Sequence, residues 1–227
     1  MSDAKEYEPP YLFPDYVSTR LRAPLQPLVK LPDGFLDFPA PRLPRPSADS
    51  ALDLTRQHAG EPIGERIIVT GRVLDSDGRP VANTMVEIWQ ANAAGRYLDQ
   101  EDKHPAPLDP NFSGAGRCQT DPQGRYRFIT IKPGAYPWRN HRNAWRPAHI
   151  HFSLFGPEFR SRLVTQMYFP GDPLMPGDPI LQSIPDPAGR ERLVSRFDPQ
   201  TTVAEWALGY EWDIVLRGRA ATPFERG

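Results

Sequence analysis

Residues 66–89, RIIVTGRVLDSDGRPVANTMVEIW, contain two strand-like runs with a turn between them. The first run, 66–74, is rich in β-branched residues, and the second, 81–89, alternates apolar and polar side chains. The sequence DSDG at 75–78 supplies the turn chemistry that joins antiparallel strands. The segment therefore predicts two strands, which we expect to form a hairpin.

Other segments downstream have the same strand character. Residues 125–131 (RYRFITI) alternate after a second turn, DPQG, and further strands are predicted at 148–154, 162–169 and 210–216. These strands, with proline- and glycine-rich loops between them, predict an all-β fold, a β-sandwich with long functional loops. Residues 90–120 form one such loop in this interpretation, and long loops on a rigid sandwich usually carry function.

One segment predicts a helix. Residues 187–197, PAGRERLVSRF, have apolar positions that fit a helical period. Asp186 stands at the N-cap position and Pro187 in the first turn, which is where each is favoured. We expect this helix to cover part of the sandwich.

The composition excludes several classes of protein. The chain of 227 residues contains 28 prolines, and each interior proline costs about 3 kcal/mol in a helix, so a helical bundle or coiled coil is excluded. The net charge of −1 provides no field that would attract nucleic acid or anionic lipid. Cys118 is the only cysteine, which excludes an intrachain disulfide and a thiolate zinc cluster.

The beginning of the chain, MSDAKEYE, lacks the basic and apolar regions of a signal peptide. No apolar run approaches the ~20 residues of a membrane span. We therefore expect a cytoplasmic protein that binds neither a membrane nor nucleic acid.

Residues 1–62 show no period of either kind and are densest in proline at 36–46, LDFPAPRLPRP. Their apolar residues favour an extended strap that lies on the body or on a partner chain; these are Tyr11, Phe13, Tyr16, Leu28, Phe35 and Phe38. The predicted organisation is an extended proline-rich N-terminal arm, 1–62, and a β-sandwich catalytic domain, 63–227.

The strongest local motif is Arg146-Pro-Ala-His149-Ile-His151. Residues two apart on a strand project from the same face, so both imidazoles are expected to point the same way and to reach one metal ion. A pair of histidines packed inside the sandwich fits the pattern equally well. His58, His104 or His141 would supply a third imidazole for a zinc site.

Tyrosines are the other candidates for completing the site. Tyr97 and Tyr136 lie in glycine- and proline-rich segments, whereas Tyr126 lies on an alternating strand and is interpreted as structural. A free phenol has a pKa near 10, so a phenolate ligand at neutral pH favours a hard trivalent ion such as Fe(III) over Zn(II). Each tyrosine taken alone also fits a packed aromatic residue on a loop.

Five runs together resemble the intradiol ring-cleaving dioxygenases: IGERIIVTGRV, VEIWQANAAGRY, LDPNFSGAGRCQTD, IKPGAYPWRN and WRPAHIHFSLFG. The likeness spans residues 62 to 218 and is thinner in the arm. It implies one Fe(III) per chain, held by the axial Tyr97, the equatorial Tyr136 that leaves the iron when substrate binds, His149 and His151. It also implies a catalytic role for Arg146, whose cation stabilises charge that develops on the substrate ring.

The resemblance further implies a set of substrate-binding residues. In the body these are Trp138, Gln166 and Ile180. In the arm, Asp15-Tyr16-Val-Ser18 resembles a substrate-pocket segment of the family, and Arg22 matches a nearby arginine. Ser18 replaces a threonine, and Leu25 stands where another arginine is expected.

Within the family, the match is closest to the iron-bearing chain of the enzymes that open 3,4-dihydroxybenzoate with O2 to 3-carboxy-cis,cis-muconate in the β-ketoadipate pathway. That likeness implies a homologous alpha chain as partner in a hetero-oligomer. Two alternatives stay open from the sequence: an intradiol enzyme for catechol or hydroxyquinol, and a non-catalytic β-sandwich binding module that retains the histidine pair in its core.

Overall fold

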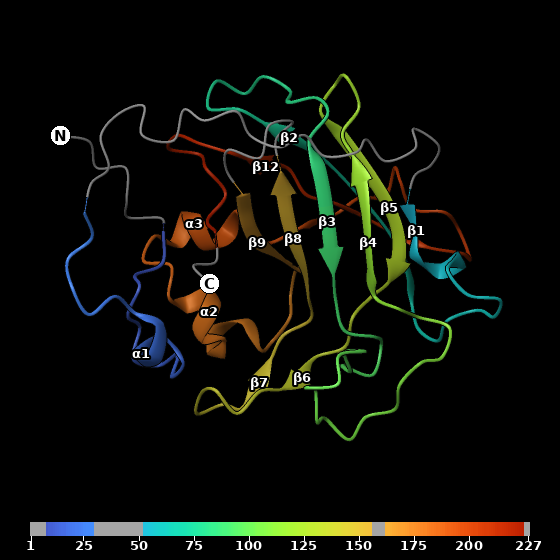
Figure 1. Cartoon of the computed structure of the whole chain (residues 1–227). Helices are drawn as coiled ribbons and strands as arrows, with labels where there is room; N and C mark the ends of the chain where they lie inside the picture. Colours follow the sequence, from blue (N-terminus) through green and yellow to red (C-terminus); the bar gives the residue numbers. More distant parts are fainter. Residues whose placement is uncertain (1–7, 30–51, 156–161, 225–227) are drawn as a thin grey trace.

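The computed structural model describes residues 8–29, 52–155 and 162–224, and the strands of this part form two sheets and a small hairpin (Figure 1). The first sheet has the order β1-β5-β2-β11-β10, and β12 also pairs with β2. Its strands are β1 (Leu52–Asp53), β2 (Arg66–Leu74), β5 (Arg125–Ile131), β10 (Arg196–Phe197), β11 (Leu208–Glu211) and β12 (Ile214–Val215).

The second sheet has the order β4-β3-β8-β9 and is antiparallel throughout. Its strands are β3 (Met85–Trp89), β4 (Ala115–Gln119), β8 (His149–Phe155) and β9 (Arg162–Tyr168). The hairpin of β6 (Tyr136–Pro137) and β7 (Trp145–Arg146) lies at one end of this sheet (Figure 1). The helical segments are α1 (Thr19–Arg22), η1 (Leu54–Arg56), η2 (Met175–Gly177), α2 (Pro179–Gln182) and α3 (Pro187–Glu191).

The core lies between the two sheets because each contributes the alternating apolar face of its strands. Val69 and Phe128 come from the first sheet, and Ile88 and Phe152 from the second; all are fully or almost fully buried in one cluster. Tyr126 belongs to the same cluster and donates its hydroxyl to the carbonyl of Trp212. The structural role predicted for Tyr126 is confirmed, as is the β-sandwich.

Strand β2 and strand β5 begin and end where the sequence predicts, but the hairpin predicted for 66–74 and 81–89 is wrong. The two segments do start to pair, since Val81 N–H donates to the carbonyl of Val73 at 2.8 Å. Beyond that point Asn83 adopts a φ of 57°, and β3 enters the other sheet, where it pairs with β4 and β8. Residues 90–120 are likewise not one loop, because β4 occupies 115–119.

The helix predicted at 187–197 is also too long. Asp186 caps it by accepting from Ala188 N–H at 3.0 Å, as expected, but α3 ends at Glu191. The backbone that follows bonds to a strand instead: Tyr168 N–H donates to Leu193 O, and Ser195 N–H donates to Tyr168 O, both at 2.8 Å. Pairing with the edge of β9 therefore replaces the last turns of the helix.

The described part of the arm, 8–29, rests on the loop between β6 and β7. Val17 N–H donates to the carbonyl of Asn140 at 3.1 Å, and Ser18 N–H donates to the side-chain oxygen of Asn140 at 2.7 Å. The proline-dense stretch 36–46 lies outside the described residues, as do Phe35 and Phe38. Leu52 and Asp53, within the range assigned to the arm, form a strand of the first sheet. The domain boundary between residues 62 and 63 stays a prediction.

Within the described ranges, no helix has both the length and the apolar character needed to cross a bilayer.

Candidate metal centre

His149 and His151 project from the same face of β8 and bring their Nε2 atoms to 3.2 Å from each other. Two nitrogen ligands that are each about 2.1 Å from one ion lie about 3 Å apart when they meet it at a right angle. The spacing therefore suits two ligands of one metal. It follows from the period of two in a strand, as the sequence predicts.

The environment of His149 fixes its tautomer. Its Nδ1 lies 2.7 Å from the carbonyl oxygen of Pro147, which can only accept, so Nδ1 carries the proton. Nε2 is then left with its lone pair facing the site. Burial, followed by the charge of Arg146, holds the pKa of His149 well below its ordinary value. Burial also lowers the pKa of His151 well below its ordinary value, with smaller effects from His149 and Arg146. Both imidazoles are therefore neutral, the form that binds metal.

Tyr136 approaches this pair from the small hairpin. It opens β6 opposite Arg146, and its hydroxyl oxygen lies 3.4 Å from His149 Nε2. The ring centroids of Tyr136 and His149 are 5.5 Å apart. The phenol oxygen therefore faces the same point as the two imidazoles.

Tyr97 reaches the site because the loop that carries it packs tightly against the segment before Tyr136. Gly95 has a φ of 77°, and a Cβ there would lie 2.2 Å from the carbonyl oxygen of Ala135. Only glycine permits this approach. Tyr97 N–H is also held by the carboxylate of Asp102 at 2.8 Å. The Tyr97 ring then meets the Tyr136 ring edge-on at 5.4 Å and lies 6.4 Å from the His151 ring.

Three of these four donors, Tyr97, Tyr136 and His151, line a cleft together with Trp138. Among the described residues, no three histidine, cysteine, aspartate or glutamate side chains gather into a group that could hold a metal ion, so the zinc site with a third histidine is not formed. His58, for example, bonds to Ser113 at 2.7 Å instead. Phenolic oxygens are what remains to complete the site, and two imidazoles with two phenols fit a hard trivalent ion such as Fe(III).

Arg146 stands beside the same imidazole, buried to 2% exposure. Its Nη1 lies 3.1 Å from His149 Nε2, and its guanidinium carbon lies 5.4 Å from the centre of the Trp138 ring. Its other nitrogens donate to Asp178, Gln166 and Tyr168. An arginine near the metal site was expected, but its pairing with a buried acid was not.

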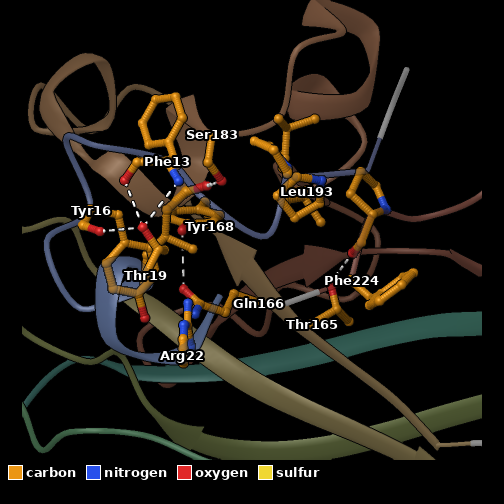
Figure 2. Close-up of a pocket in the computed structure, with 15 residues that line it drawn as sticks. Phe13, Tyr16, Thr19, Arg22, Thr165, Gln166, Tyr168, Ser183, Leu193 and Phe224 are labelled. Atoms are coloured by element: carbon orange, nitrogen blue, oxygen red, sulfur yellow. Dashed lines mark hydrogen bonds between the residues drawn. The ribbon is translucent and has the colours of Figure 1, made fainter. Parts of the chain in front are cut away.

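The predicted substrate-binding residues divide between two places. Trp138 lines the metal cleft, whereas Tyr16, Arg22, Gln166 and Ile180 line a neighbouring, mostly apolar pocket between the arm and β9 (Figure 2). The two places touch where the Tyr16 ring packs against the Trp138 ring at 5.2 Å. Ser18 is in the lining of neither, and its backbone holds the arm to Asn140.

Three residues at the site are not among those that the sequence predicts. Trp89 stacks on His151, and Tyr168 and Asp178 contact Arg146. Tyr168 follows Gln166 by two residues on β9, so the same strand period that groups the histidines would have placed it on the face of Gln166. Asp178 carried only the signature of a helix cap before a proline.

Comparison with known sequences gives consistent matches along the chain. Residues 40–218 match the protein family described as Dioxygenase, and residues 8–33 match the family described as Protocatechuate 3,4-dioxygenase beta subunit N terminal. A protocatechuate 3,4-dioxygenase beta chain from Burkholderia cepacia is 62% identical over 221 residues, which are 96% of this chain and 94% of that protein.

More distant relatives share the body of the chain. A protocatechuate 3,4-dioxygenase alpha chain from Pseudomonas putida is 30% identical and covers 71% of this chain and 76% of its own length. Among solved structures, the dioxygenase domain of a dioxygenase carbohydrate-binding protein fusion from Streptomyces sp. SirexAA-E has a TM-score of 0.52 and 27% identity over 79% of this chain and 99% of that one. The chain belongs to the intradiol ring-cleaving dioxygenase family.

Proposed function

We propose that this chain is the iron-bearing subunit of an enzyme that cleaves 3,4-dihydroxybenzoate between its two hydroxyl-bearing carbons with O2, giving 3-carboxy-cis,cis-muconate. The observation that carries the proposal is that the Tyr136 hydroxyl and Nε2 of His151 lie 3.4 Å and 3.2 Å from Nε2 of His149, with Tyr97, Tyr136 and His151 lining one cleft. The 62% identity to a protocatechuate 3,4-dioxygenase beta chain supports the choice of substrate.

Tyr97, Tyr136, His149 and His151 are the residues that would hold one Fe(III) per chain. Fe(III) bound there would act as a Lewis acid toward the oxygens of a catechol and would draw electron density from its ring. Tyr136 is the proton acceptor in this proposal, because its oxygen faces the cleft from a half-buried position on the hairpin. A catechol hydroxyl that enters the cleft can transfer its proton to that oxygen.

Arg146 and Trp138 act on the ring of the substrate. Nη1 of Arg146 is the end of the guanidinium that faces the imidazole of His149, so its charge lies next to the cleft. A fixed cation in a buried site stabilises negative charge that develops on the ring, and costs no reorganisation when it does so. The Trp138 indole gives the ring a flat apolar wall and shields it from water.

Arg22 is the candidate partner for the carboxylate of the substrate. Its guanidinium carbon lies 4.5 Å above the Tyr16 ring, at the edge of the pocket that Gln166 and Ile180 also line (Figure 2). An exposed guanidinium supported by an aromatic ring can bind a carboxylate in a bidentate manner. Arg146 is not available for this role, because it pairs with Asp178.

The partner in this proposal is a homologous alpha chain. The described part of the arm exposes large apolar side chains, with Leu21 at 92% and Leu25 at 98% exposure. Large apolar side chains that are this exposed are typical of a protein interface. The match of residues 8–33 to the beta-subunit N-terminal family supports the assignment of this surface to the alpha chain.

The test is to express the chain alone and together with an alpha-type chain. We expect the co-expressed protein to be a reddish hetero-oligomer that contains one iron per chain of this type and converts 3,4-dihydroxybenzoate faster than catechol or hydroxyquinol. We expect the chain alone to aggregate or to be poorly active. A colourless, iron-free hetero-oligomer would refute the metal assignment, and a preference for catechol or hydroxyquinol would refute the substrate assignment.

A further inference from the structure

The guanidinium of Arg146 is held through two of its three nitrogens by groups outside the metal cleft. Nε lies 3.2 Å from one carboxylate oxygen of Asp178, and Nη2 lies 2.8 Å from the other. This is a bidentate pair, which fixes the plane of the guanidinium as well as its position. Asp178 is completely buried, so the pair is shielded from water.

Tyr168 and helix α2 hold the carboxylate of Asp178 in place. The Tyr168 hydroxyl lies 2.8 Å from Oδ2 of Asp178 and 3.0 Å from Oε1 of Gln166. Figure 2 shows Tyr168 and Gln166 side by side in the wall of the pocket between the arm and β9, joined by the hydrogen bond from the Tyr168 hydroxyl to Oε1 of Gln166. Asp178 is also the N-cap residue of α2, and its side chain accepts from Ile180 N–H. The acid is therefore tied to a strand and to a helix at once.

The consequence is a defined direction for the remaining nitrogen. With Nε and Nη2 occupied by Asp178, Nη1 is the nitrogen that points to His149 Nε2. Burial has the largest single effect and lowers the pKa of Arg146, but the charge of Asp178, together with Tyr168 and Tyr136, outweighs it and holds that pKa well above its ordinary value. Arg146 is therefore charged, and its partner determines which way the charge faces.

We propose that Asp178, supported by the Tyr168 hydroxyl, is a positioning residue that aims Nη1 of Arg146 at the substrate ring. This inference rests on the proposed function, because it requires a ring to be bound beside His149. Asp178 is not among the residues that line the cleft, and its side chain bonds to Arg146, Tyr168 and Ile180. It acts through Arg146.

The alternative role for Asp178 is that of a plain helix cap with an ion pair, and the chain offers a matched control. Asp186 also precedes a proline, caps a short helix through Ala188 N–H and pairs with an arginine, Arg192, at 3.5 Å. Asp178→Asn and Asp186→Asn therefore remove the same features, one beside Arg146 and one elsewhere.

The experiment measures both variants in the iron-loaded complex with an alpha-type chain. For Asp178→Asn we expect unchanged iron content, an anaerobic Kd for 3,4-dihydroxybenzoate within threefold of the unaltered protein, and a kcat at least tenfold lower. For Asp186→Asn we expect kcat within twofold. A kcat for Asp178→Asn within twofold of the unaltered protein, or an equal loss in both variants, would overturn the proposal.

A double variant separates positioning from structure. If Asp178 acts through Arg146, then adding Asp178→Asn to Arg146→Gln costs no further activity, because the group it positions is gone. Losses that multiply would overturn the proposal. If Asp178→Asn does not fold, Tyr168→Phe decides: a kcat at least threefold lower at full iron content supports the proposal, and an unchanged kcat overturns it.

A readout independent of turnover separates this proposal from the function on which it rests. An unaltered complex that does not cleave 3,4-dihydroxybenzoate would refute the function. In that case the crystal structure of the Asp178→Asn chain, or of the Tyr168→Phe chain, decides the positioning role. Displacement of Nη1 from the imidazole of His149 supports it, and an unmoved guanidinium overturns it.

Discussion

The indole of Trp89 lies parallel to the imidazole of His151, with ring centroids 4.7 Å apart and planes 5° apart. The two residues are direct partners in the ladder between β3 and β8. Residues directly opposite each other in an antiparallel pair bring their side chains into contact, so the register of the sheet creates the stack. The indole blocks rotation of the imidazole and keeps its Nε2 directed at that of His149.

Trp89→Ala is therefore expected to weaken iron binding without unfolding the sandwich. Groups that orient a metal ligand typically contribute about tenfold or more to metal affinity. The measurement is iron per chain after dialysis against a chelator. Trp206→Ala is the control, because Trp206 is 40% exposed and contacts Arg66 instead. Equal iron retention in both variants would show that the stack does not position His151.

Tyr136→Phe is expected to retain iron and to bind substrate more slowly, because the proton acceptor in the cleft is removed. The visible band of the iron protein should also shift, since one of two phenolate donors is lost. Stopped-flow absorbance measures both effects. Tyr126→Phe removes a phenol whose hydroxyl bonds to Trp212 O in the core, and it should leave the band unchanged. An unshifted band in Tyr136→Phe would exclude Tyr136 as a ligand.

Local pattern predicts the strands well and their partners poorly. The sequence predicts strands β2 and β5 at their observed bounds, because strand-like composition in the first, alternation in the second and turn residues beside both define them locally. Residues 210–216 were predicted as one strand, but they divide between β11 and β12 because the side chain of Asp213 accepts Arg72 N–H at 2.8 Å and takes the place of a ladder bond. This replacement of a ladder hydrogen bond by a side-chain hydrogen bond depends on a residue 141 positions away in the sequence.

The same distinction holds at the site. The strand period alone grouped the two histidines, whereas the residues offered Tyr97 and Tyr136 only as candidates and the family resemblance singled them out as ligands. Asp178 could not be predicted, because nothing in the sequence near residue 178 reveals that the chain brings it to Arg146. The sequence indicates that Asp178 caps a helix, but its contact with Arg146 arises from the tertiary fold.

Cys118 is expected to be unreactive in the folded chain. Burial raises the pKa of its thiol to about 12. At pH 8 only about one thiol in ten thousand is then ionised, and the thiolate is the form that reacts. A thiol reagent should therefore label the protein at pH 8 only after denaturant is added. Stoichiometric labelling of the native protein within minutes would contradict the buried position of Cys118.

Asn140→Ala is expected to loosen the arm and thereby to weaken substrate binding. The side-chain oxygen of Asn140 accepts from Ser18 N–H at 2.7 Å, two residues beyond Tyr16. Loss of this bond costs about 1 kcal/mol, while the main-chain bond from Val17 N–H to Asn140 O remains. Because Tyr16 packs against Trp138 at 5.2 Å, a displaced arm opens the wall of the cleft.

We therefore expect KM for 3,4-dihydroxybenzoate to rise about threefold to tenfold in Asn140→Ala, with kcat changed less, because a loss of about 1 kcal/mol in ground-state binding corresponds to a factor of this order. Steady-state kinetics of the complex with the alpha-type chain measure KM and kcat separately. Asn111→Ala is the control: its side chain also makes a hydrogen bond to the backbone, by donating from Nδ2 to the carbonyl of Glu61 at 3.3 Å, but it does not hold residues 8–29. A KM that rises equally in both variants, or in neither, would show that Asn140 does not hold Tyr16 in the substrate site.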